Sequence, residues 1–275
     1  MKYFFFFCFG FIPLMVHGQV SVTIKSKETG EPISYANVWK SNKIYASSDS
    51  LGTFSIGENE LNIPFKISAL GYKTKDSILI NEAKTIYLEE DFIELKEVLL
   101  SKKVNAKKIK VGKLKNGDVG VVSEMNKETA QIGRFFSNDS GETLFLDKFR
   151  FKAICATRNC IVNILIYAVG KNGEPAEIIN RNNIPCKVKK GHHINEVDLS
   201  DLNIQFPPEG IFIMVNYLFL EQNKLFGNKN ENWYYYEPSI DAASVESYTD
   251  TWYNYNNEWK KNDKYSVCFQ LSLTN

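Results

Sequence analysis

The sequence has few of the residues that most often carry catalysis or bind metals. Only three of its 275 residues are histidine. No Gly-x-Ser-x-Gly motif and no phosphate-cradling glycine loop occurs. Acidic and basic residues are nearly balanced, with a formal net charge of +1. This balance gives no electrostatic attraction to nucleic acid or to anionic membranes, so we expect no nucleic-acid partner.

Long hydrophobic runs are also scarce. One apolar run follows Lys2 and extends to Val16, and no second run of about 18 residues follows it. A charged start, an apolar run and the small residue Gly18 are typical of a secretory signal peptide, here residues 1–18, cleaved before Gln19. We therefore expect an exported chain with no transmembrane segment after cleavage.

Few cysteines remain after the expected cleavage: Cys155, Cys160, Cys186 and Cys268. An even number in an exported protein suggests two disulfides, and four cysteines allow three pairings. Cys155 and Cys160 flank a short turn-like segment between two strand-like runs, so we expect a bridge across that turn and a second bridge between Cys186 and Cys268. The alternative is that some of these thiols stay free and buried.

Long segments with helical periodicity are absent, which argues against a helical fold. Short alternating apolar runs are instead separated by Gly, Asn, Asp and Pro, as in all-β proteins. In the first part of the chain we expect strands at 20–24, 33–39, 44–47, 53–56, 65–69, 77–80 and 85–88. About seven short strands with turns every 8–12 residues predict a β-sandwich at residues 19–100.

Several short motifs in this region have a shared order and spacing. They are Thr29-Gly30-Glu31-Pro32-Ile33, Ala36-Asn37-Val38, Ser48-Asp49 with Gly52-Thr53-Phe54, Leu70-Gly71-Tyr72-Lys73, Ile86-Tyr87-Leu88 and Leu95-Lys96-Glu97-Val98. In these motifs, residues 19–100 resemble the carboxypeptidase-like regulatory domain, a transthyretin-like β-sandwich. The same module resembles the N-terminal extension of TonB-dependent outer-membrane receptors. The resemblance implies an accessory, non-catalytic module and a location in the periplasm or at the cell surface.

The remaining residues, 101–275, are predicted to form a second, jelly-roll-like β-sandwich that includes a lysine-rich connector. Seven lysines lie between residues 101 and 115, but the alternation of Ile109 and Val111 favours a solvated strand over a lipid-binding segment. Gly117-Asp118 reads as a turn, with 119–122 as the return strand. Further strands are expected at 143–155, 161–169, 194–199, 211–220 and 265–273. Two stacked antiparallel sheets suit this length and pattern.

Aromatic and polar residues concentrate between residues 232 and 261. The candidate ligand-binding residues there are Trp233, Tyr235, Trp252, Tyr253, Tyr255 and Trp259. Flat rings beside amides and carboxylates suit a sugar, because the rings cover its C–H faces while the polar groups bind its hydroxyls. Tyr and Trp are equally favoured anchors in protein interfaces. The alternative is that alternate rings belong to the core.

One motif invites an enzymatic reading. His193-Ile194-Asn195-Glu196 has the spacing of zinc carboxypeptidase ligands, and His192 adds a second imidazole. Zinc needs three protein ligands and a general base, but no histidine follows His193. Glu237 and Asp241 are near in sequence, which alone does not make a glycosidase pair. We expect no enzyme, no metal and no cofactor. The sequence predicts a non-catalytic recognition or scaffolding protein that binds a protein partner, or alternatively a glycan; a hydrolase with an unrecognised site is the third reading.

Overall fold

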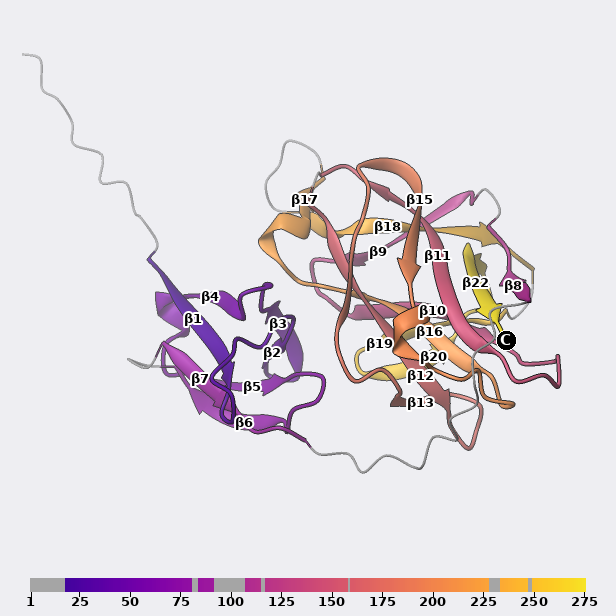
Figure 1. The fold of residues 1–275 in the computed structure, drawn as a ribbon. Coiled ribbons are helices and arrows are strands. Elements are labelled where there is room, and N and C mark those ends of the chain that lie inside the picture. Colours follow the sequence, from indigo (N-terminus) through magenta and orange to yellow (C-terminus); the bar gives the residue numbers. More distant parts are fainter. Residues whose placement is uncertain are drawn as a thin grey trace, which may run out of the picture.

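The computed structural model describes residues 18–80, 84–91, 107–114, 117–157, 159–227, 233–246 and 249–275. These residues form an all-β structure of two lobes, each built from two sheets (Figure 1). We call the lobe of residues 19–88 the N-terminal sandwich and the lobe of residues 108–274 the C-terminal sandwich. The prediction of an all-β, sandwich-type fold is confirmed. The expected signal peptide and the expected boundary near residue 100 lie outside the described residues.

The N-terminal sandwich pairs a three-stranded sheet with a four-stranded one. The first has the order β4 (Thr53–Gly57), β1 (Gln19–Ser26), β7 (Thr85–Leu88), and the second β3 (Lys43–Ser47), β2 (Asn37–Lys40), β5 (Pro64–Ser68), β6 (Lys75–Leu79). A 3-10 helix, η1 (Glu58–Glu60), follows β4. Alternate residues of these strands, including Val22, Ile24, Phe54, Val38 and Ile67, pack into one apolar core. The strand β1 pairs with β7 in parallel, and the other pairs are antiparallel.

The turn before β4 depends on a glycine. The carboxylate of Asp49 accepts backbone N–H groups from Leu51 and Thr53, both at 2.8 Å. Gly52 lies between them with a φ of 70°. A Cβ there would lie 2.7 Å from the Ile24 carbonyl oxygen, closer than real side chains approach. This motif therefore serves the geometry of the turn, because only glycine fits both its φ and its space.

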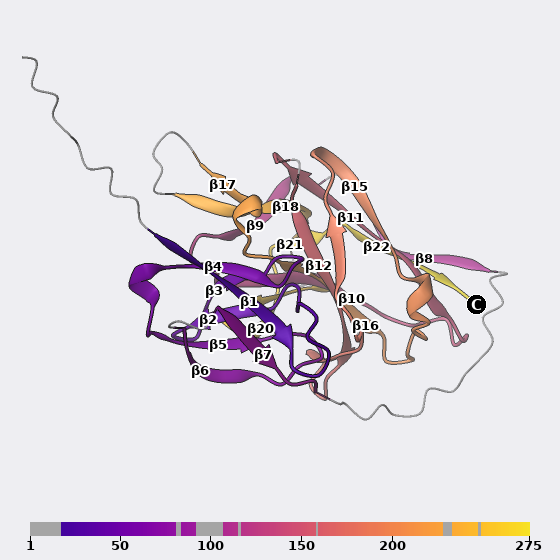
Figure 2. The same ribbon diagram turned by 60° about the vertical axis from the view of Figure 1, so that its left-hand side comes forward.

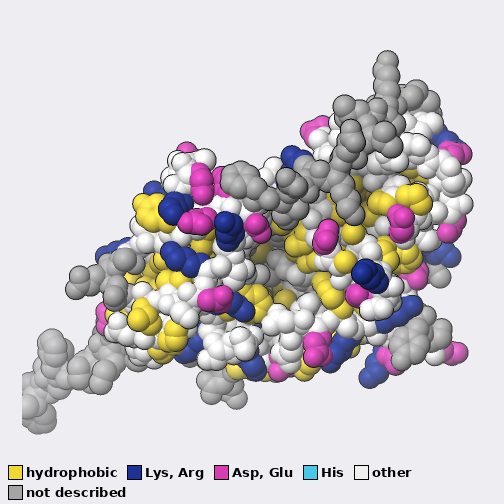
Figure 3. All heavy atoms as spheres, turned by 90° about the horizontal axis from the view of Figure 1, so that it is seen from below, with side chains coloured by type: hydrophobic (Ala, Val, Ile, Leu, Met, Phe, Trp, Pro, Cys, Tyr) yellow, Lys and Arg dark blue, Asp and Glu magenta, His cyan; other side chains and the backbone are white. Residues whose placement is uncertain are grey.

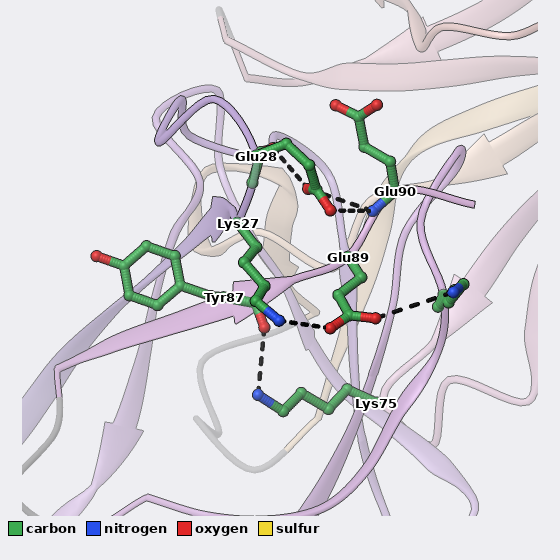
Figure 4. A network of polar contacts seen from close by, with 8 residues as sticks. Lys27, Glu28, Lys75, Tyr87, Glu89 and Glu90 are labelled. Atoms are coloured by element: carbon green, nitrogen blue, oxygen red, sulfur yellow. Dashed lines mark hydrogen bonds and ion pairs between the residues drawn. The ribbon is translucent and has the colours of Figure 1, made fainter. Parts of the chain in front are cut away.

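A network of polar contacts lies on the surface near the end of β7 (Figure 4). Lys27 Nζ lies 2.6 Å from Glu89 Oε1, and the Glu28 carboxylate accepts the backbone N–H of Glu90 at 3.4 Å. Lys75 donates to the carbonyl oxygen of Tyr87 at 3.2 Å. The hydrogen bond from Lys27 lowers the pKa of Glu89. Exposed pairs of this kind contribute little stability.

The C-terminal sandwich pairs a seven-stranded sheet with an eight-stranded one. The seven-stranded sheet has the order β13 (Pro175–Ile178), β12 (Ile161–Val169), β16 (Ile211–Tyr217), β10 (Thr129–Phe136), β19 (Thr251–Tyr255), β20 (Glu258–Lys261), with β14 (Ile184–Lys187) beside β12. The eight-stranded sheet has the order β17 (Lys224–Phe226), β18 (Tyr234–Ser244), β11 (Phe145–Cys155), β22 (Phe269–Thr274), β8 (Lys108–Gly112). In that sheet β15 (Gly191–Asp198) pairs with β11, while β9 (Val119–Glu124) and β21 (Tyr265–Val267) pair with β18. Two 3-10 helices complete the lobe, η2 (Ser200–Leu202) and η3 (Glu221–Asn223).

The chain crosses repeatedly between these two sheets. Among the long strands, β10 and β12 lie in the seven-stranded sheet and β11, which comes between them in the sequence, lies in the eight-stranded sheet. The lysine-rich connector does provide a strand, β8, as expected. The expectation that residues 119–122 return beside it is wrong, because β9 pairs with β18 and β8 with β22.

The most apolar strand, β16, is buried on both faces. Ile211, Ile213 and Val215 face the core between the sheets. Phe212 and Met214 face the other way and join a separate cluster that includes Leu70 of the N-terminal sandwich. A β-strand reads as a continuous apolar run only when both faces are covered. Here the N-terminal sandwich helps to cover the outer face of the seven-stranded sheet.

Hydrogen bonds and apolar contacts join the two sandwiches, which lie side by side in Figure 1; in Figure 2 the N-terminal sandwich lies in front of part of the C-terminal sandwich. The backbone N–H of Ser47 donates to the Phe219 carbonyl at 3.2 Å, and the Phe219 N–H donates to Ser47 Oγ at 3.0 Å. Asn183 Nδ2 donates to the Ser34 carbonyl at 3.0 Å. Ile44 of β3 is buried in the main cluster of the C-terminal sandwich. The joint is therefore formed by buried and reciprocal contacts from specific residues of both lobes.

Neither expected disulfide is present among the described residues, although Cys155 and Cys160 lie close enough to interact. All four cysteines, Cys155, Cys160, Cys186 and Cys268, are free and buried. Cys155 Sγ donates to the Thr157 carbonyl at 3.1 Å, so its thiol has a local partner. Cys186 lies on β14 and Cys268 just before β22, in opposite sheets. Burial raises the pKa of Cys186 to about 11. Such thiols act as small apolar core groups, which a count of cysteines does not reveal.

The surface carries charges of both signs. Viewed from below, lysines, arginines and acids are scattered over both lobes, with hydrophobic side chains between them (Figure 3). In the described part of the chain, no helix is long and apolar enough to cross a membrane.

Candidate ligand-binding site between the sandwiches

A pocket of about 400 Å³ lies where the two sandwiches meet. The N-terminal sandwich lines it with Gln19, Tyr45, Ala46, Ser47, Asp49, Thr53, Phe54 and Ser55, and the C-terminal sandwich with Lys127, residues 219–222, Lys224, Tyr234 and Tyr236. These residues come from β1, β3, the β3–β4 turn and β4 on one side, and from the β9–β10 turn, residues 219–220, η3, β17 and β18 on the other. Neither lobe forms this pocket alone.

Lys127 lies at the centre of the aromatic wall. The turn after β9 places it there, with its N–H bonded to the Glu124 carbonyl at 2.8 Å and a φ of 57°. Its ammonium group donates to the Tyr45 carbonyl. The same nitrogen lies 5.6 Å from the ring centroid of Tyr45, 5.8 Å from that of Phe219 and 5.6 Å from that of Tyr236. Three rings therefore surround one cation from both sandwiches.

Burial changes the acid–base chemistry of this lysine. Desolvation, followed by repulsion from Lys224, lowers the pKa of Lys127 from 10.5 to about 8. Burial also raises the pKa values of the Tyr45 and Tyr236 hydroxyls. Among the ion pairs of the described residues, none includes Lys127. The pocket thus holds a largely buried cation that has rings and a carbonyl as neighbours and no carboxylate partner.

Four aromatic residues flank the pocket at the β17–β18 strand pair, and we call them the aromatic cluster. Phe226 and Tyr234 lie on the face of the pocket, and Trp233 and Tyr235 lie on the opposite, outer face. Phe226 is 53% exposed and Trp233 48% exposed. The Phe226 and Tyr234 ring centroids lie 5.8 Å apart, and those of Trp233 and Tyr235 lie 5.5 Å apart. Lys224 Nζ lies 4.1 Å from the Tyr234 centroid, which links this aromatic cluster to the pocket.

The structure does not bring the six sequence-predicted aromatic residues onto one surface. Trp233 and Tyr235 belong to the aromatic cluster at the eight-stranded sheet. Trp252 and Trp259 lie on the outer face of the seven-stranded sheet, against Phe212 and Tyr167 at 5.6 and 5.3 Å between centroids.

The last two of the six are tyrosines of β19. Tyr253 packs against the main core. The Tyr255 hydroxyl donates to Glu128 Oε2 at 2.6 Å. Alternation along β19 therefore sends neighbouring rings to opposite faces, as the pleat of a strand requires.

Sequence reasoning missed the residues around Lys127. Tyr45 and Phe219 lie 174 positions apart in the sequence, and each follows an ordinary strand pattern. Lys127 itself gave no clear signal, because a single lysine in a turn between two strands is interpreted from sequence alone as a solvated residue.

The zinc-like motif makes other contacts. His192 Nε2 lies 2.6 Å from Asp241 Oδ2, and Glu196 accepts from Lys148 at 2.7 Å and from Arg150 at 2.6 Å. Hydrogen bonds from these two cations lower the pKa of Glu196. Within the described ranges, no group of three His, Cys, Asp or Glu side chains could hold a metal ion.

Comparison with solved structures gives distant similarity only. Two solved structures are similar in fold: the clostridial cysteine protease Cwp84 after propeptide cleavage, and the cysteine protease and lectin-like domains of Cwp84, a surface-layer-associated protein of Clostridium difficile. Identities are 13% and 12%, TM-scores are 0.40 and 0.41, and each match covers 83% of this chain. The chain spans about half of those chains, 54% and 48%. No curated protein matches the chain.

The family comparison is more specific. A family model described as the CarboxypepD_reg-like domain matches residues 20–100, which contain every strand of the N-terminal sandwich after the first residue of β1. The resemblance found in the sequence motifs is thereby confirmed. Residues 20–100 therefore match the CarboxypepD_reg-like domain.

Proposed function

We propose that this protein is an exported, non-catalytic recognition protein of the periplasm or cell surface that binds a protein partner. Export is supported by the signal-like N-terminus and by the CarboxypepD_reg-like domain that follows it. On this proposal, the N-terminal sandwich is an accessory module that completes a binding surface together with the C-terminal sandwich.

The observation that carries the proposal is the exposed aromatic cluster. Phe226 and Trp233 keep about half of their surface in solvent although both have large apolar rings. Aromatic side chains of this kind are the commonest energetic anchors of protein interfaces, where a few residues carry most of the binding energy. The neighbouring Lys224 adds a charged rim beside apolar rings, the arrangement typical of such interfaces.

Site-specific photo-crosslinking tests this proposal. A photoreactive phenylalanine analogue replaces Trp233 in the full chain, expressed and exported in its native host. We expect a discrete protein adduct on irradiation, lost when excess purified wild-type protein competes. A Tyr235→Ser variant, which lacks the ring 5.5 Å from Trp233, should compete at least about fivefold less well, because loss of one anchor costs about 1 kcal/mol or more.

The control places the same analogue at Ile194, an exposed apolar residue of β15 that lies outside the aromatic cluster. An adduct of equal yield at Ile194, or no competed adduct at Trp233 from folded protein, would contradict the proposal.

A glycan-binding protein is the second candidate, favoured by the pocket. Tyr45, Phe219 and Tyr236 offer flat rings next to polar groups, which is the chemistry that sugar recognition needs. A glycan array of the mature chain tests it, with Trp233→Ala and Trp252→Ala beside the wild type. Binding that either variant loses would locate the sugar outside the pocket, and binding that both retain would favour the pocket.

A further inference from the structure

We propose that the pocket between the sandwiches binds an acidic sugar, with the carboxylate of a uronic acid residue placed at Lys127 and Lys224. This inference rests on the proposed role as a binding protein and specifies the ligand of its second candidate. It concerns the pocket and does not involve the exposed ring of Trp233.

The charge of Lys127 is the first reason. Burying an ammonium group costs several kcal/mol unless an anion accompanies it. In the described residues, Lys127 has the Tyr45 carbonyl and three aromatic rings as neighbours, but no carboxylate forms an ion pair with it. Lys224, which lines the same pocket, adds a second positive charge. An anionic ligand would supply the missing counter-charge.

The two acidic residues of the pocket, Asp49 and Glu221, do not prevent an anion from binding there. Asp49 already accepts two backbone N–H groups, from Leu51 and Thr53. Glu221 lies 3.5 Å from Lys224, but its side chain is 86% exposed to solvent. A pair this exposed is weak, so a ligand carboxylate can replace Glu221 as the partner of Lys224 at a small cost in free energy.

The walls favour a sugar over a free inorganic anion. Tyr45, Phe219, Tyr234 and Tyr236 present rings to the pocket, and a phosphate ion would leave all of these unused. The C–H faces of a pyranose ring can pack on them. Hydroxyl and amide groups of Thr53, Ser55 and Gln19 line the N-terminal side, where they can bond sugar hydroxyls. The volume of about 400 Å³ is within the usual range for small-ligand sites.

Isothermal titration calorimetry of the full mature chain tests the inference. The probes are tetragalacturonate, neutral maltotetraose and a tetraglutamate peptide. We expect binding of tetragalacturonate and at least tenfold weaker binding of maltotetraose. The Lys127→Met variant should bind tetragalacturonate at least tenfold more weakly, and Lys224→Met should show a smaller loss in the same direction.

Lys66→Met is the matched control, since Lys66 also lies over an aromatic ring, Trp39, at 4.9 Å but outside the pocket. It should bind as the wild type does. No tetragalacturonate binding by folded wild type, equal binding by Lys127→Met, or Lys127-dependent binding of the peptide alone would each overturn the inference.

Failure of this inference can be told apart from failure of the proposed protein partner. With the analogue at position 233, Tyr235→Ser should weaken the crosslinked adduct and keep tetragalacturonate binding, while Lys127→Met should keep the adduct and lose the sugar. A spectrum of circular dichroism that matches the wild type confirms that each variant is folded.

Discussion

The buried ammonium of Lys127 makes the stability of the protein depend on pH in an unusual direction. Its pKa is about 8 in the folded chain, against 10.5 for the unaffected group. Between these two values the unfolded chain binds more protons than the folded chain. The free energy of unfolding therefore rises with pH across this window. Most lysines that gain a carboxylate partner give the opposite trend.

The magnitude follows from the two pKa values. At pH 7 the charged Lys127 lowers the free energy of unfolding by about 3 kcal/mol, and at pH 10 by about 1 kcal/mol. Lys127→Met removes this cost and also one hydrogen bond to the Tyr45 carbonyl, worth about 1 kcal/mol. We expect the variant to be more stable than wild type by about 2 kcal/mol at pH 7 and equally stable near pH 10.

Urea unfolding at pH 7, 8, 9 and 10 measures this difference for the two proteins. The groups that face Lys127 are Lys224, Glu221, Tyr45 and Tyr236, and all of them remain in the variant. Subtracting the two curves thus isolates Lys127, and Lys66→Met controls for loss of a ring-facing lysine. Parallel curves for wild type and Lys127→Met would refute the reasoning, because they would mean that Lys127 is not desolvated.

Two further predictions concern the fold. Gly52→Ala should lower the free energy of unfolding of the N-terminal sandwich by about 2 kcal/mol or more, because a Cβ would meet the Ile24 carbonyl. The matched control is Gly30→Ala, at a similar φ of 74° but with open space around the Cβ, which should cost about 1 kcal/mol. Urea unfolding measures both losses. Equal losses of unfolding free energy in the two variants would contradict this prediction, because they would show that the positive φ alone sets the cost and that the contact with Ile24 adds nothing. Mass spectrometry after alkylation in denaturant without reductant should find all four thiols of the mature chain modified, and unmodified pairs would contradict the free-thiol structure.

Sequence patterns were a good guide to strands and a poor guide to their partners. The strands at 161–169 and 211–217 follow from continuous apolar runs, which require burial on both faces. The parallel pairing of β1 with β7 and the separation of β8 from β9 could not be predicted, since periodicity within a strand carries no information about its neighbour.

The pocket was beyond sequence reasoning for a physical reason. Its chemistry arises where Tyr45 of one sandwich meets Lys127 and Tyr236 of the other, and a lysine shows its desolvation only after the lobes are in place. The aromatic segment gave only a partial signal. Composition identified Trp233 and Tyr235 near the pocket, but the pleat of β19 turned Trp252 and Tyr253 to opposite sides.

The central claim is that both sandwiches together form one binding surface. It is tested most directly by placing the photoreactive analogue at Ser55, on the N-terminal side of the pocket, and separately at Tyr234, on the C-terminal side. The account predicts that both positions capture the same ligand, identified by mass spectrometry, while the distant Leu79 of β6 captures none of it. Capture of different species at the two positions, or capture from one sandwich only, would contradict the claim.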